Sequence, residues 1–169
     1  MAEIWVSAVL YVAIGTVVLT IILAAGLPVI NKLRDKNTIV QTKNAMHELD
    51  DTIRTVVNEG PGSQRLRTLD FRSGELAIDQ NIDKISWKME TRFLESEPGI
   101  SIKEGTLDIL TEEDKYVVGK YWTKLSLDYS TVADIDSTST MLIGRYNLLI
   151  KNEGLDTATN KIKILINEQ

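Results

Sequence analysis

The chain has 169 residues, no cysteine and a formal net charge of −5. The negative charge argues against a nucleic-acid partner, because nothing offsets the repulsion by phosphates. The lack of cysteine excludes disulfides, thiolate nucleophiles and zinc-thiolate sites, so that a folded domain must be stable by packing alone.

An uncharged run occupies residues 4–31, between Glu3 and Lys32. As a helix at ~1.5 Å per residue it would be roughly 40 Å long, enough to cross a hydrocarbon layer of ~30 Å. A membrane, or an equally apolar protein environment, must therefore surround it. Lys32, Arg34 and Lys36 follow the run directly, a position that is typical of a membrane-interface anchor.

The apolar run does not match a cleavable secretory signal. Such signals begin with basic residues and have an apolar stretch of about 7–15 residues before a small-residue cleavage site. Here the sequence begins Met1-Ala2-Glu3, and the run is about twice too long. We therefore expect the segment to stay in the mature protein.

The helical pattern continues as a one-faced helix over residues 32–58. Apolar residues recur at steps of three and four, at Ile39, Ala45, Met46, Leu49, Ile53, Val56 and Val57. The charged residues lie elsewhere on the helical wheel: Asp35, Lys43, Glu48, Asp50, Asp51 and Arg54. The sequence Asn58-Glu59-Gly60-Pro61-Gly62 predicts the helix end. We predict one helix of roughly 80 Å, with a kink or a short unwound stretch at Gly26 and Pro28.

From Arg65 onward apolar residues alternate with polar ones, and turns containing glycine separate short segments. This period of two predicts an antiparallel meander rather than parallel strands joined by helices. Strands are expected at residues 66–71, 76–78, 82–89, 100–102, 107–110, 116–129, 141–151 and 162–166, with a turn at Ser73-Gly74. The segment 130–140 is rich in Ser, Thr and Asp and is expected to be an exposed loop.

A one-faced helix and a one-faced sheet bury both apolar stripes when they pack together. The predicted fold class is therefore α+β, with one long N-terminal helix packed on an antiparallel β-sheet head domain. The ~140 residues outside the apolar run suit one domain of ordinary size. We place a spine helix at 1–59, apolar over 4–31 and amphipathic over 32–58, and the head domain at 60–169.

No group of side chains in the sequence suggests catalysis, and we expect a protein that is not an enzyme and that uses no cofactor or metal. His47 is the single histidine and has no obvious nucleophile as a partner. Glu112-Glu113-Asp114 matches no EF-hand spacing and is interpreted as a solvated turn, as are Asp134 and Asp136. Gly60-Pro61-Gly62 is a helix stop rather than a phosphate loop, since no Gly-Lys-Ser/Thr follows.

Three features together carry a likeness to a known family: the start Ala2-Glu3-Ile4-Trp5-Val6, the uncharged run with its break at Gly26-Leu27-Pro28, and the amphipathic continuation through Val57. With the sheet behind them, they resemble a type IV pilin-like filament subunit. The lack of cysteine is more similar to archaeal than to bacterial members.

The resemblance implies a structural protein of the cell surface. Such a subunit waits in the membrane lipid, is trimmed by a prepilin peptidase, and is moved by assembly machinery into a helical homopolymer. The apolar helices of its copies then bundle into the filament core, and the heads form the outer surface. The filament would serve adhesion, surface attachment or motility.

Several residues of the apolar helix are candidates for a role in assembly. The resemblance implies that Glu3 pairs with the terminal amine of a neighbouring subunit, the alternative being that it lies in headgroup water. Trp5 fits an aromatic belt at the membrane interface, and Gly15 and Gly26 permit close approach of helices. Val18 lies in the middle of the expected core, where a charge would have no partner. The candidate assembly residues are Glu3, Trp5, Gly15, Val18, Gly26 and Pro28.

Two alternatives remain open at this stage. The first is a single-span membrane-anchored β-domain protein that forms no filament. Lys32, Arg34 and Lys36 favour it, because the positive-inside rule alone would leave the head in the cytoplasm. The second is a minor pilin or a pseudopilin of a secretion system, which would have the same layout.

Overall fold

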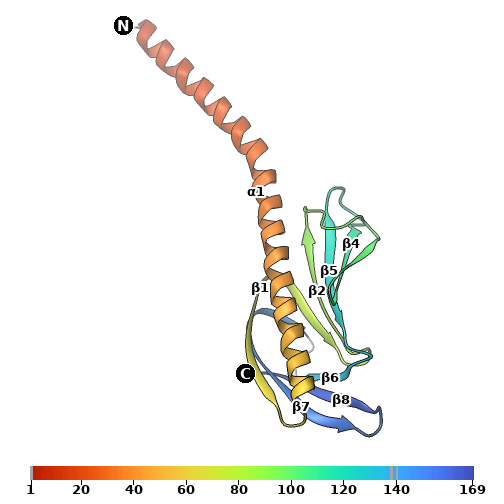
Figure 1. Cartoon of the computed structure of the whole chain (residues 1–169). Helices are drawn as coiled ribbons and strands as arrows, with labels where there is room; N and C mark the ends of the chain where they lie inside the picture. Colours follow the sequence, from red (N-terminus) through yellow and green to blue (C-terminus); the bar gives the residue numbers. More distant parts are fainter. Residues whose placement is uncertain (1, 138, 140) are drawn as a thin grey trace.

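In the computed structural model the chain forms one long helix packed on one sheet, so the predicted α+β fold is confirmed (Figure 1). The structure describes residues 2–137, 139 and 141–169, without the side chains of 2–4 and 141–143. The helix is α1 (Ala2–Glu59). The strands are β1 (Gln64–Asp79), β2 (Lys84–Thr91), β3 (Ser101–Glu104), β4 (Leu107–Glu113), β5 (Tyr121–Asp128), β6 (Ala133–Ser137), β7 (Met141–Asp156) and β8 (Lys161–Glu168).

Helix α1 stays helical through Gly26 and Pro28, so the expected unwound stretch is absent and only the kink remains. Figure 1 shows the helix bending between its free upper part and its packed lower part. The helix ends where the sequence predicts, because Gly60 adopts a φ of 91° that side chains disfavour. The Ser63 hydroxyl donates to the Val56 carbonyl at 2.8 Å and so satisfies one of the last free acceptors of the helix.

The strands form one sheet in the order β3-β4-β5-β2-β1-β7-β8-β6, antiparallel except for the β6–β8 pair. The expected simple meander is therefore wrong, because β5 pairs with β2 and β7 pairs with β1, strands far apart in the chain. The turn expected at Ser73-Gly74 is instead an irregularity inside β1, between Phe71 and Leu76. Gly74 has a φ of 81°, and a Cβ there would lie 2.6 Å from the Lys88 carbonyl oxygen. The bend lets the sheet curve around the lower half of α1 (Figure 1).

The core lies between α1 and the concave face of the sheet. From the helix it takes most of the predicted apolar face: Ile39, Met46, Leu49, Ile53 and Val56, all fully buried. From the sheet it takes alternate residues, among them Leu76, Ile85, Trp87, Ile109, Leu125 and Ile150. Trp87 is fully buried, and its indole Nε1 donates to the Ser73 carbonyl at 3.0 Å. This bond holds the bend of β1 against β2.

Further sequence expectations for the head are wrong. The segment 130–140 is not simply an exposed loop, because β6 runs through it with Ala133 and Ile135 buried; Thr138 and Thr140 lie outside the described residues. Its acidic residues misled the prediction, since they face lysines of β8 across the strand pair rather than only water. The turn expected at residues 112–114 begins only at Asp114, after the end of β4. The strand expected from residue 116 begins only at Tyr121, and residues 116–120 belong to the loop before it.

Candidate functional site

The free part of α1, residues 5–30, is left exposed by the rest of the described chain. Between Trp5 and Ile30 the helix carries 16 large apolar side chains that are exposed, among them Trp5 at 74% and Val18 at 49%. None of its most apolar stretch is buried by the rest of the described chain. The helix is long and apolar enough to span a membrane. The first helix residue in the apolar core of the head is Ile39.

The candidate assembly residues are spread along this free segment and do not meet within one chain. Trp5 and Pro28 are separated by roughly 35 Å along the helix axis. Apart from the adjoining helix backbone and the two neighbouring residues, no atom lies within 4 Å of where a Cβ of Gly15 or Gly26 would stand. Their lack of a side chain therefore serves no contact inside this molecule. The side chain of Glu3 lies outside the described residues.

The threonine hydroxyls that interrupt the apolar run are hydrogen-bonded within the helix. The Thr16 hydroxyl donates to the Val12 carbonyl at 2.9 Å, and the Thr20 hydroxyl donates to the Thr16 carbonyl at 2.8 Å. Both hydroxyl protons are therefore engaged without water. The segment offers an apolar surface on every side, which requires apolar surroundings on every side.

A set of contacts, called the clamp below, lies at the junction between the free and packed parts of α1. The sequence did not predict these contacts. Asp35 accepts the Arg92 backbone N–H at 2.8 Å, and Lys36 lies 5.5 Å from the centre of the Phe93 ring. Lys43 pairs with Glu95 at 3.0 Å and also with Glu104. Burial lowers the pKa of Lys43, but the two ion pairs outweigh it and raise that pKa overall. The loop after β2 is thereby fixed to the helix.

A second cluster, centred on Asp50, joins the packed part of α1 to two turns of the sheet. The side chain of Asp50 accepts the Tyr129 hydroxyl at 2.9 Å, the Thr106 hydroxyl at 2.6 Å, and the Arg54 Nε. Asp50 is charged but only 4% exposed, a burial that the sequence did not predict. Burial, with the nearby Asp50 charge, raises the pKa of Tyr129 far above its usual value.

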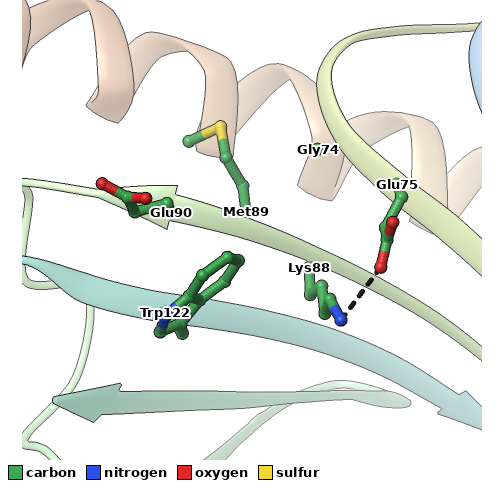
Figure 2. A pocket seen from close by; sticks show the side chains of 6 residues that line it. All are labelled: Gly74, Glu75, Lys88, Met89, Glu90 and Trp122. Atoms are coloured by element: carbon green, nitrogen blue, oxygen red, sulfur yellow. Dashed lines mark ion pairs between the residues drawn. The ribbon is translucent and has the colours of Figure 1, made fainter. Parts of the chain in front are cut away.

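The convex face of the sheet carries a shallow hollow of about 430 Å³ beside Trp122 (Figure 2). Figure 2 shows Lys88 of β2 reaching toward Glu75, and their charged atoms are 2.9 Å apart. Glu90, on the rim, pairs with Lys120. The charges around the hollow are therefore paired, and the Lys88 Nζ also lies 5.8 Å from the centre of the Trp122 ring.

The acidic residues of β6 contribute to strand pairing. Lys161 of β8 lies 3.2 Å from Asp134 and 3.0 Å from Asp83, and Lys163 lies 3.0 Å from Asp136. The Thr159 hydroxyl and Lys161 hold the pKa of Asp134 below its usual value. Among the described residues no group of three or more His, Asp and Glu side chains is arranged to hold a metal ion.

His47 lies at the helix–sheet boundary, with its Nε2 3.8 Å from a Glu104 carboxylate oxygen.

The free part of α1 is the feature that most clearly requires a partner, because its apolar side chains are not buried by the rest of the described chain. Comparison of the chain with known protein families, with curated proteins and with solved structures finds no match.

Proposed function

We propose that this chain is the structural subunit of an extracellular type IV pilus-like filament, polymerising through its apolar N-terminal helix. One observation carries the proposal: the free part of α1 has apolar side chains exposed around its whole circumference. Burying each large apolar side chain is worth about 1.5–3 kcal/mol. A helix with 16 of them exposed needs a surrounding of lipid or of sister helices.

The rigid connection between this helix and the head supports the filament over a simple anchor. Helix α1 continues without a break from the free part into the head core, where Ile39 to Val56 are buried. The clamp at Asp35 and Lys43 adds fixed contacts at the junction. An anchor works equally well on a flexible linker, whereas a filament subunit must present its head in one position relative to the core.

A single-span anchored protein is the second candidate, and one observation favours it. Lys32 and Lys36 are exposed directly after the apolar run, where the positive-inside rule would retain them in the cytoplasm. A minor pilin or a pseudopilin would share the membrane stage but not the long homopolymer. Shearing of cells distinguishes these candidates, because only the main subunit of a filament is released as long filaments composed of this chain.

The proposal is tested by shearing cells that express the full chain and imaging the released material. We expect thin, uniform filaments composed of this chain. Val18→Lys places a charge in the core and should abolish them, because the buried ammonium has no partner. Val18→Leu keeps the site apolar and serves as the matched control. The membrane content of each variant is measured in parallel, so that failed insertion is recognised.

The filament proposal fails if shearing releases nothing and the native chain is extracted from membranes as a monomer by detergent. Filaments of normal number and length from Val18→Lys would also contradict it, since the free part of α1 could not then be the core.

A further inference from the structure

The loop between β4 and β5 exposes apolar side chains on a rigid tip. Tyr116 is 92% exposed and Val118 is fully exposed, with Val117 between them also exposed. Asp114 holds the loop: its Oδ1 accepts the backbone N–H of Tyr116 at 2.8 Å and that of Val117 at 2.9 Å. Its Oδ2 accepts the Trp122 indole N–H at 3.0 Å. These bonds hold the loop in the conformation that leaves its apolar tip exposed.

Strand register places this tip at the end of the sheet from which the free helix emerges. Tyr121, where β5 begins, pairs with Thr91, where β2 ends. The next residue, Arg92, donates its N–H to Asp35 of α1 at 2.8 Å. Figure 1 shows this end of β4 and β5 turned toward the free part of α1. The base of the loop is therefore level with Asp35.

The tip lies beyond this base, at the end of the sheet nearest the free part of α1 (Figure 1). The Asp114 backbone N–H donates to the Lys120 carbonyl at 3.0 Å, and residues 115–119 form bends and a turn between them. The base of the loop is level with Asp35, which follows the end of the uncharged run at Asn31 by four residues, or about 6 Å of helix. Leu94 and Ile100, on the adjacent loop, are exposed at the same end.

We propose that the membrane-facing tip, residues 115–118, docks into the interfacial layer of the same lipid bilayer that holds the apolar helix. This inference rests on the membrane stage of the proposed function. The bilayer boundary must lie near the end of the uncharged run, and the tip projects from the end of the sheet whose base is about one helix turn from that level. Tyrosine is enriched at such boundaries, and a lysine such as Lys115 can bury its stem there while its ammonium stays in water.

The attraction is apolar rather than electrostatic. Lys115 at the tip is exposed, but so are Glu112 and Glu113 on the strand just behind it, and Lys120 pairs with Glu90. The charges at this end are therefore mixed, and a zwitterionic bilayer is a sufficient partner. Docking at a second point, besides the helix, would fix the tilt of the head on the membrane before assembly.

Because the chain has no cysteine, a single introduced cysteine can carry a nitroxide label at one chosen site. The full chain is reconstituted into phosphatidylcholine vesicles with the label at Val118→Cys, Ala158→Cys or Val17→Cys. Ala158 is exposed in the β7–β8 turn, and Val17 lies in the apolar run. Label accessibility is measured to oxygen, which concentrates in lipid, and to a nickel chelate, which stays in water.

We expect the ratio of oxygen to nickel accessibility to be several-fold higher at 118 than at 158, and highest at 17. Adding Tyr116→Ser should lower the ratio at 118. Equal ratios at 118 and 158, with 17 in lipid, would overturn the docking and leave the proposed function intact. Protection of 118 from both reagents would assign the tip to a second copy and also overturn it. A water-accessible label at 17 would overturn both proposals.

Discussion

Replacing Asp50 by alanine should destabilise the head by about 2–4 kcal/mol, because the change leaves buried donors without an acceptor. The hydroxyl of the fully buried Tyr129 loses its partner, at a cost of about 1–3 kcal/mol. Arg54 and Thr106 are partly or largely exposed and can turn to water, so together they add only about 1 kcal/mol. Asp51→Ala, at the exposed neighbouring position, should change stability by less than about 0.5 kcal/mol.

The assay is urea unfolding of the full chain in mild detergent, followed by the fluorescence of buried Trp87. A double-mutant cycle with Tyr129→Phe sharpens the test. In the wild-type background Tyr129→Phe should be destabilising, whereas beside Asp50→Ala it should be neutral or stabilising, since it removes the orphaned hydroxyl. If Asp50→Ala matches Asp51→Ala, or if the two costs simply add, the reasoning about this cluster is refuted.

Three further predictions concern other parts of the molecule. Gly15→Leu should raise helix propensity by about 1 kcal/mol and cause no clash within the chain, yet reduce filament yield on shearing; unchanged yield would place Gly15 away from helix contacts. Gly74→Ala should cost at least about 2 kcal/mol in urea unfolding, since its Cβ would meet Lys88 and Trp87 at a φ of 81°. The raised pKa of Tyr129 means that its stabilisation is complete below about pH 10 and is lost as the pH rises further. The melting temperature should therefore fall more steeply above pH 10 for the wild type than for Tyr129→Phe, and parallel curves would contradict this.

Much of the spine helix could be predicted from the sequence, because the patterns that indicate it involve residues close together in the chain. The steps of three and four from Ile39 to Val56 predicted the buried face of α1, and Gly60 predicted the end of the helix. Strands with strict alternation, such as the one carrying Ile85 and Trp87, were also found. Each of these signals depends on neighbours within a few residues along the chain.

The errors fall where a polar residue finds its partner far away in the sequence. The sequence grouped Asp50 with the other charged residues of the helix and did not predict its burial, but Tyr129 and Thr106 come to it from the sheet. The segment containing β6 was taken for a loop because it is rich in Ser, Thr and Asp, yet Lys161 and Lys163 of β8 face its carboxylates. The type of a polar residue indicates that it prefers contact with water, but a hydrogen-bonding or charged partner from a distant segment can take the place of that water.

By itself the sequence determined that a long helix exists, that residues 4–31 need apolar surroundings, and that this helix continues into the head without a linker. The tertiary structure decided how the head meets that helix. It bends β1 at Gly74 so that the sheet curves around α1, and it brings Arg92 to Asp35. Through these contacts the loop that carries Tyr116 begins level with Asp35, about one helix turn after the end of the apolar run. The physical reason is that periodicity is fixed by adjacent residues, whereas register and burial of polar groups are fixed by contacts between segments far apart in the chain.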